Sequence, residues 1–250
     1  MTKTKRALQT LLTLAMLLAA TRAGAQTVNL ARPAASGEEH GRLYRAFMIG
    51  LNLGELPWQG SFKLGVTLGY HINEHAYVGV MYQIPDHIKR DGSSINAGAV
   101  GLAGLSSSSE SVGHRLLVET RLRPHRYAPY VTLGVVLNAA DTETISFDDR
   151  TRDIAGQSYS GRITIKQTRP LGIRPAIGLG YGYTFDFGLS LNVQWSGWVF
   201  AKAPAPEIEI DSPTLDAKAR RFLEQRITDK FQKSPFNLYH VFALGVGYVF

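Results

Sequence analysis

Most of the chain alternates between large apolar residues and small or polar residues in eight separate segments. In the second segment every second residue from Phe62 to Ile72 is large and apolar, and the residues between them, such as Thr67, are not. A period of two is typical of a β-strand with two unlike faces, and about ten residues is the length that a tilted strand needs to cross a bilayer. We therefore expect strands at residues 43–53, 62–72, 76–84, 112–122, 128–138, 172–185, 188–200 and 237–250.

The second face of these strands separates two architectures. A soluble sheet turns its apolar face inward, and its other face then carries many Lys and Glu residues. In this chain the second face consists mainly of Gly, Ala, Thr, Ser and Asn. Such residues suit the narrow lumen of an eight-stranded barrel, and the apolar face suits lipid. The pattern predicts an all-β, eight-stranded antiparallel transmembrane β-barrel over residues 43–250.

The connections between these strands alternate in length. Three are short turns and three are longer than the loops of an ordinary compact domain, as in outer-membrane barrels with periplasmic turns and extracellular loops. The turns cover residues 73–75, 123–127 and 186–187; the long loops cover 85–111, 139–171 and 201–236; the first outer loop, 54–61, is brief. Within the third outer loop, residues 142–147 and 162–166 alternate again, which predicts that strands five and six extend past the membrane as a hairpin.

Aromatic residues sort by strand end, as expected for rings at the two membrane–water interfaces. Near the short turns we place Tyr70, Tyr77, Tyr127, Tyr130, Tyr181, Tyr183, Phe185, Phe187, Tyr248 and Phe250. Near the opposite edge we place Trp58, Trp195, Trp198 and Phe200.

The last outer loop contains apolar residues at helical spacing. Ser212 can cap a helix with Pro213 at its first position, and basic residues fill the remaining positions. We predict an amphipathic helix over residues 213–231 that lies on the outer leaflet, covers the barrel mouth, or packs on neighbouring loops. Its apolar positions are Leu215, Ala219, Phe222, Leu223, Ile227 and Phe231.

Several charged residues fall on the lumen face by alternation. Unpaired buried charges are costly, so we expect Glu119 to bridge two or more of the cations. The predicted polar network of the lumen consists of Lys63, Arg115, Glu119, Arg121, Arg174, Asn192 and Gln194. Such a network can form a gated polar pore or a structural plug, and the narrow interior of eight strands favours the plug.

Catalytic and metal chemistry have little support. His114 and Glu119 are five residues apart on one strand and so point to opposite faces. Asp86 and His87 lie in the loop that also contains the serine run 106–109, and such runs are usually flexible. Histidines in turns, namely His71, His75 and His125, are usually solvated rather than metal ligands. We expect no enzyme activity, no metal and no cofactor.

The amino terminus indicates export. Residues 1–25 have a basic start, an apolar stretch and the small-residue ending Ala23-Gly24-Ala25, which is typical of a cleaved signal peptide, and residues 26–42 read as a flexible leader. Four cations lie in the signal peptide, so the formal charge of +7 falls to +3 after cleavage and gives no support to nucleic-acid binding. The chain has no Cys, which excludes disulfides and thiol chemistry.

The carboxy-terminal residues carry a resemblance. The chain ends in Phe250 with Tyr248 two residues before it and apolar residues at every second earlier position, and it resembles the small eight-stranded outer-membrane barrels of the OmpA membrane-domain and OmpX type. The resemblance implies that the barrel-assembly machinery reads Phe242, Leu244, Val246, Tyr248 and Phe250. Unlike OmpA, the chain shows no peptidoglycan-binding domain after the barrel.

We therefore expect a monomeric barrel in the outer membrane of a Gram-negative-type bacterium, in contact with outer-membrane lipid and, during biogenesis, with the assembly machinery. Its expected role is structural or a surface interaction through the long extracellular loops. Two alternatives stay open: a narrow channel for small or hydrophobic solutes, which requires a continuous lumen, and a lipid-modifying enzyme, which requires His, Ser and acidic side chains at one rim.

Overall fold

A computed structural model describes residues 47–54, 63–91, 101–125, 127–198, 200, 202–233 and 238–250. All of these described residues belong to one compact unit. The predicted signal peptide, the leader and the first residues of the first strand lie outside the described residues.

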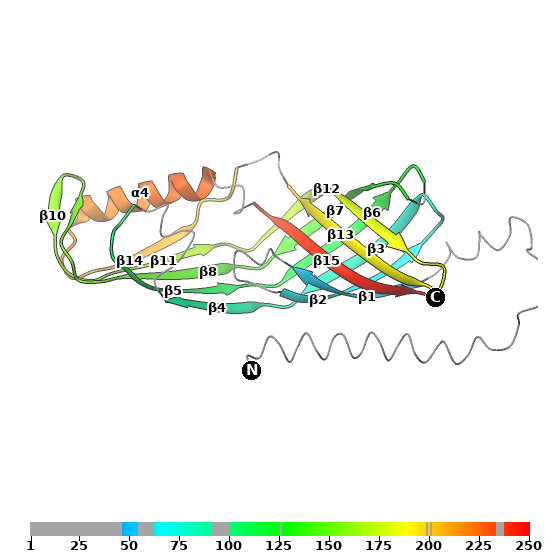
Figure 1. Cartoon of the computed structure of the whole chain (residues 1–250). Coiled ribbons are helices and arrows are strands. Elements are labelled where there is room, and N and C mark those ends of the chain that lie inside the picture. Colours follow the sequence, from blue (N-terminus) through cyan, green and yellow to red (C-terminus); the bar gives the residue numbers. More distant parts are fainter. Residues whose placement is uncertain are drawn as a thin grey trace, which may run out of the picture. The chain divides into compact units, whose positions relative to one another are not determined.

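Eight antiparallel strands close into a barrel, as predicted (Figure 1). Closure joins the first strand to the last, with Met48 opposite Val249 and Leu53 opposite Leu244. Around the barrel the order is β1-β15-β13-β12-β7-β6-β3-β2. The strands are β1 (Phe47–Gly54), β2 (Lys63–His71), β3 (Ala76–Gln83), β6 (Arg115–Leu122), β7 (Tyr130–Asn138), β12 (Gly172–Thr184), β13 (Leu189–Gly197) and β15 (His240–Val249).

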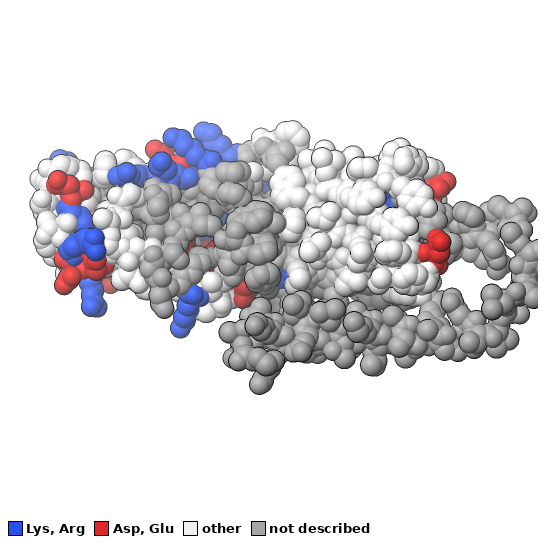
Figure 2. Space-filling view, viewed as in Figure 1, with Lys and Arg blue, Asp and Glu red and all other residues white. Residues whose placement is uncertain are grey.

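The outward face of the barrel is apolar. Among the described strand residues no Asp, Glu, Lys or Arg occupies an outward position of the alternation, and Figure 2 shows the wall of the barrel as mostly white. Leu179 is 66% exposed and Leu244 is 56% exposed, values that would be costly in water but suit contact with acyl chains. The alternation therefore has the sense expected of a transmembrane barrel.

Aromatic rings cluster at the barrel end that carries the turns 72–75, 123–129 and 185–188, here called the short-turn end. Stacked or edge-on pairs link Tyr127 to Tyr183, Tyr183 to Phe185, and Phe185 to Phe187. Tyr77 and Tyr130 do not join this belt, because both are buried inside the barrel, at 3% and 4% exposure.

Beyond the barrel lies a second, five-stranded sheet of order β14-β11-β8-β5-β4. The predicted hairpin is confirmed, since β8 (Asp141–Phe147) pairs with β11 (Ile163–Arg169). The sequence did not predict β4 (Asp86–Asp91), β5 (Leu105–Val112) or β14 (Glu207–Asp211). The serine run, predicted to be flexible, is part of β5 and pairs with both β4 and β8. A small hairpin, β9 (Arg152–Ile154) with β10 (Gln157–Tyr159), completes the strands of this region.

The predicted helix is present as α4 (Ala217–Lys233) and packs on this sheet. Its buried side chains meet Ile145, Ile163 and Ile165 in a core that also holds Phe147, Ile154, Ile210, Leu215, Ala219, Leu223 and Ile227. Packing on neighbouring segments is therefore the correct one of the three predicted placements. We call the five-stranded sheet with α4 the platform. No helix in the described part of the chain is long and apolar enough to span a bilayer.

Two details of the helix prediction are wrong. The cap is Asp216, whose Oδ1 accepts a hydrogen bond from Ala219 N at 2.7 Å, and not Ser212 with Pro213. Phe222 is 40% exposed because it lies on the face of α4 turned away from the core.

The pleat shifts by one residue where barrel strands continue into platform strands. In β7 the even-numbered residues Val136 and Asn138 are buried, whereas in β8 the odd-numbered residues Ile145 and Phe147 are buried. The same shift occurs at residues 84–85, 113–114 and 170–171. Because of it, the odd-numbered apolar residues face outward in β7 but face the covered core in β8, so Leu133 is 46% exposed and Ile145 is fully buried.

Candidate functional site

The barrel interior is filled by side chains in three layers, of which the layer nearest the short-turn end is centred on Glu119. Arg121 Nη2 lies 2.6 Å from Glu119 Oε1, and Gln194 Nε2 donates a hydrogen bond to Glu119 Oε2. Tyr130 OH donates to Gln194 Oε1 at 3.1 Å. The guanidinium carbon of Arg121 lies 4.5 Å from the centre of the Tyr77 ring and 5.0 Å from that of Tyr130.

Glycines opposite these residues make room for them. Glu119 stands in register with Gly79 on one neighbouring strand and with Gly134 on the other. A Cβ at Gly79 would lie 2.3 Å from Tyr77 OH, and one at Gly180 would lie 2.4 Å from a Tyr130 ring carbon. The small residues that the sequence places on the lumen face therefore accommodate the large side chains of adjacent strands.

The middle layer is partly apolar. Met81, Leu117 and Val136 are fully buried and pack together in one cluster. Beside them Asn52 Nδ2 donates to Thr67 Oγ1 at 3.0 Å, and Gln83 Nε2 donates to Asn52 Oδ1 at 3.0 Å and to the Phe242 carbonyl at 2.8 Å. The middle layer therefore combines a buried apolar cluster with a buried, hydrogen-bonded polar group.

The third layer lies where the barrel meets the platform and is centred on Asp141. Arg115 donates from Nη1 to Asp141 Oδ1 at 2.9 Å and from Nη2 to Asp141 Oδ2 at 2.6 Å. Arg169 Nη2 also donates to Asp141 Oδ2. Burial alone would raise the pKa of Asp141, but the charges of Arg169 and Arg115 and the hydrogen bond from Gly113 N outweigh it, so this pKa is lowered. Lys63 Nζ donates to the Gly113 carbonyl.

Six of the seven predicted lumen residues are buried inside the barrel: Lys63, Arg115, Glu119, Arg121, Asn192 and Gln194. Among the described residues Glu119 pairs with one cation, Arg121, and the prediction that it bridges two or more is wrong, because Asp141 takes Arg115 and Arg169.

Arg174 differs from the prediction because its side chain is exposed. It lies 5.3 Å from the centre of the Tyr239 ring and donates to the carbonyl of Ile173. β13 pairs with β12 only from Ile177 onward, so among the described strands the part of β12 that carries Arg174 is paired with β7 alone.

Sequence reasoning missed two groups of interior residues. Asp141 and Arg169 lie just beyond the predicted strand ends, and the shift of the pleat hides their orientation. Met81, Leu117 and Val136 occupy lumen positions by alternation, so their apolar character was a signal that part of the interior is apolar.

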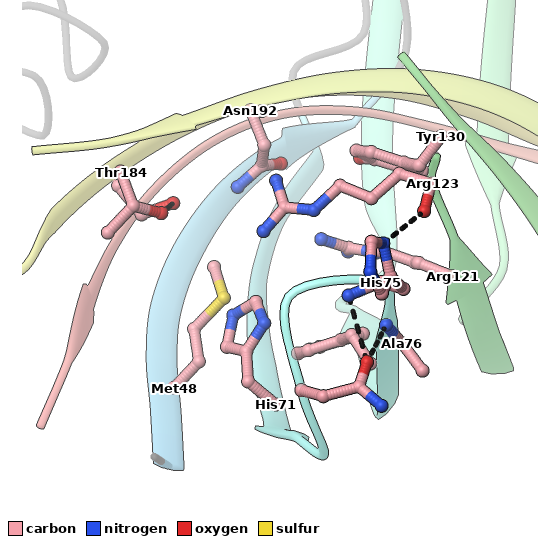
Figure 3. Close-up of a pocket in the computed structure, with 13 residues that line it drawn as sticks. Met48, His71, His75, Ala76, Arg121, Arg123, Tyr130, Thr184 and Asn192 are labelled. Atoms are coloured by element: carbon pink, nitrogen blue, oxygen red, sulfur yellow. Dashed lines mark hydrogen bonds between the residues drawn. The ribbon is translucent and has the colours of Figure 1, made fainter. Parts of the chain in front are cut away.

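A small pocket remains between the Glu119 layer and the short-turn end, with a cavity volume of about 30 Å³. Figure 3 shows Arg121 and Arg123 entering it from one side, with Asn192, Thr184, Met48 and His71 around the other side. His71 and His75 both line the pocket, and His75 Nδ1 lies 3.3 Å from the Arg123 carbonyl. No group of three or more possible metal ligands occurs among the residues that the structure describes.

Comparison with known proteins gives the fold. No protein-family model matches the chain, and no curated protein matches it. Two solved structures of Acinetobacter baumannii CarO proteins are similar. CarO2 has 10% sequence identity and a TM-score of 0.56, and the alignment covers 82% of this chain and 99% of that chain. CarO has 12% sequence identity and a TM-score of 0.53, and the alignment covers 81% of this chain and 97% of that chain. The N-terminal barrel of Pseudomonas aeruginosa OprF aligns at 12% identity over 82% of this chain and 98% of that chain, with a TM-score of 0.31.

The fold is that of an eight-stranded outer-membrane barrel. At these identities the similarity to the CarO proteins establishes the fold and carries no activity over to this chain.

The residues of the predicted assembly signal lie along the outward face of β15, with Phe250 directly after the last strand residue. Leu244 is 56% and Phe250 60% exposed, and Tyr248 stacks on Phe250 with ring centres 6.0 Å apart. Recognition of these residues by the assembly machinery stays a prediction.

The exposed face of α4 is basic. Figure 2 shows Lys and Arg side chains gathered over α4, and the exposed cations on the helix are Lys218, Arg221, Arg226, Lys230 and Lys233. Two acidic residues, Glu224 and Asp229, share this face, so its net charge is positive. The opposite face of α4 is anchored in the platform core, which fixes the direction in which the cations point.

Proposed function

We propose that this chain is an outer-membrane protein, exported by the signal peptide of residues 1–25, whose closed barrel anchors the platform for contact with anionic molecules outside the cell. The basic face of α4 on its folded support is the observation that carries this proposal. A rigid array of cations attracts polyanions over about a Debye length and loses little entropy on binding.

The filled interior supports an anchoring role over a transport role. An ion on the barrel axis would have to displace the Glu119–Arg121 pair, the apolar cluster around Leu117 and the cations bound to Asp141. Each of these groups is buried and partnered, so the cost of opening all three layers is high.

Binding of a sulfated polysaccharide to the refolded full-length mature protein in detergent micelles tests the surface role. We expect heparin to bind in a salt-dependent manner and neutral dextran not to bind. The triple variant Lys218→Gln, Arg221→Gln, Lys230→Gln should weaken heparin binding roughly tenfold or more. The matched variant Lys89→Gln, Arg162→Gln, Lys202→Gln removes three exposed cations elsewhere and should bind nearly as well as the unmodified protein. Equal losses in the two variants would refute a specific role for α4.

Planar bilayer recording tests whether the filled barrel interior blocks ions. We expect no reproducible single-channel conductance from the refolded protein. A stable conductance would favour the narrow-channel alternative, and it would leave the heparin experiment as a separate result.

A further inference from the structure

The pocket at the short-turn end has the chemistry of an anion site. Two guanidinium groups, those of Arg121 and Arg123, line it together with the rings of His71 and His75, and no Asp or Glu is among its lining residues. Glu119 lies behind Arg121, where it neutralises one of the two cations. Arg123 donates from Nε to the Glu74 carbonyl at 2.8 Å, which holds its side chain in place at the rim.

Two of the residues that line the pocket each carry a buried polar atom that has no hydrogen-bond partner in the described part of the chain. Tyr77 is 3% exposed and its hydroxyl is unpartnered, and Asn192 is 6% exposed and its Oδ1 is unpartnered. A buried polar atom without a partner costs free energy, and two such atoms at one cavity indicate that a ligand or ordered water completes them.

The Tyr77 hydroxyl and Asn192 Oδ1 need hydrogen-bond partners of different kinds. The Tyr77 hydroxyl can donate to an anion, whereas the Asn192 Oδ1 only accepts and so needs a ligand that also carries a donor. A phosphate group has both, because near neutral pH it is anionic and retains a P–OH donor in part of its population. The cavity of about 30 Å³ holds roughly two to three water-sized probe spheres, which fits one small oxyanion and excludes a sugar or nucleotide.

We propose that the pocket formed by Tyr77, Arg121, Arg123 and Asn192 binds a single phosphate group at the short-turn end of the barrel. Arg121 and Arg123 neutralise its charge, the Tyr77 hydroxyl donates to one oxygen, and Asn192 Oδ1 accepts from the P–OH. Thr184 and Ser190, which also line the pocket, supply two further hydroxyl groups. The site is independent of the platform, because α4 contributes none of its lining residues.

Isothermal titration calorimetry tests the proposal. Inorganic phosphate is titrated into the refolded full-length mature protein in a non-ionic detergent. We expect saturable one-to-one binding. Sulfate, which has no O–H donor at neutral pH, should bind several-fold more weakly because Asn192 Oδ1 is then left unpartnered. Saturable phosphate binding with this preference supports the site; absence of saturable binding, or equal binding of sulfate, overturns it.

Variants locate the binding. Arg123→Gln and Asn192→Asp should each weaken phosphate binding roughly tenfold or more, the first by loss of a cation and the second by placing a carboxylate against the anion. Lys166→Gln removes one cation from the platform and should leave binding unchanged. Heat-modifiable gel migration shows whether each variant has folded. We choose Arg123 for substitution because replacing Arg121 would also remove the cation that pairs with the buried Glu119. Equal affinity of Arg123→Gln and the unmodified protein would refute the assignment.

Two further ligands separate the sources of the phosphate. Glycerol 3-phosphate tests a soluble monoester, and micelles doped with phosphatidic acid test a lipid head group that is also a phosphate monoester. A soluble phosphate should compete with the monoester at the same site. If only the lipid produces a change and Arg123→Gln does not reduce it, the response comes from the barrel's outer surface and the pocket proposal fails.

Discussion

The barrel and the platform share continuous strands but place their apolar residues on opposite sides. In the barrel, Leu133 is 46% exposed on the outer face and Glu119 is 3% exposed on the inside. In the platform, Leu223 and Ile165 are buried and the cations of α4 are exposed. Because the hydrophobic effect removes apolar groups from water, each arrangement shows which solvent surrounds that region.

The apolar residues change sides through a one-residue shift of the pleat between each barrel strand and the platform strand that continues it. At residues 139–140 and 170–171 the pleat shifts, so the odd-numbered positions, which face outward in β7 and β12, face the covered core in β8 and β11. A one-residue shift of a strand moves every side chain to the other face. The chain therefore keeps its apolar residues on odd-numbered positions, and the shift turns them from the lipid-facing side of the barrel into a platform core that holds Ile145, Ile163 and Ile165.

The largest difference in stability loss is expected between a buried ion pair of the barrel and an exposed ion pair of the platform. Glu119→Gln leaves Arg121 without its carboxylate in a site with 0% side-chain exposure at residue 119, so we expect a loss of about 3–5 kcal/mol in the free energy of unfolding. Glu209→Gln breaks the Lys166–Glu209 pair, whose side chains are 45% and 72% exposed, and should cost less than about 1 kcal/mol. Urea titrations of the refolded variants followed by tryptophan fluorescence measure both. Similar small losses would mean that water reaches the barrel interior.

The platform core should respond strongly to loss of a buried side chain. Leu223→Ala opens a cavity beneath α4 and should destabilise the platform by about 3 kcal/mol, whereas Phe222→Ala, at the neighbouring exposed position, should cost much less. Hydrogen exchange of the α4 amides measures the free energy of local opening. Equal effects at the two positions would contradict the packing of α4 on the sheet.

Insertion of a charge separates a lipid-facing residue from a water-facing one. Leu133→Arg places a guanidinium on the outer face of the barrel wall and should cost about 2–4 kcal/mol if this position lies near the bilayer midplane. Phe222→Arg makes a similar change at an exposed apolar position of α4 and should be close to neutral. Folding yield and urea stability in lipid vesicles measure the difference, and a harmless Leu133→Arg would show that the outer face meets water.

The Asp141 layer should make stability depend on pH. The pKa of Asp141 is lowered in the folded protein, so its stabilising contribution is fully present above its unfolded pKa of about 3.9 and is lost as the pH falls through the folded pKa. The stability advantage of the unmodified protein over Asp141→Asn should therefore be full at pH 7 and shrink below about pH 4. Asp153→Asn removes an exposed carboxylate of the β9–β10 hairpin and serves as the charge-matched control. An advantage that stays constant down to pH 2 would contradict the ion pairs with Arg115 and Arg169.

The barrel could be predicted from the sequence because lipid imposes strict alternation on every strand. The platform could be predicted only in part, because its strands obey weaker rules: β5 is mostly serine, and its pairing with β4 and β8 rests on backbone hydrogen bonds. In β14 the alternation of Ile208 and Ile210 with acidic residues was present but very short.

The interior contacts could not be predicted from alternation alone. Alternation gives the face of each residue but not its partner on another strand, so it could not show that Arg115 binds Asp141 and that Glu119 pairs with Arg121 alone among the described cations. The exposed side chain of Arg174 depends on where the pairing of β12 with β13 ends, and the period of the sequence carries no information about that end.

The smallest effect is expected at the amino-terminal end of α4. Asp216 accepts hydrogen bonds from the amides of Ala219 and Lys218, which lower its pKa, so Asp216→Ala leaves first-turn amides without an acceptor. The remainder of the helix stays anchored through Leu223 and Ile227, so we expect hydrogen exchange to become several-fold faster in the first turn and to change little beyond it. Asp229→Ala, a substitution at an exposed interior position of the same helix, should leave the first turn unchanged. If the Asp216 variant instead exposed all of α4 to exchange, the cap and not the buried leucine and isoleucine side chains would hold the helix on the sheet, and the contrast between a lipid-supported barrel and a core-supported platform would fail.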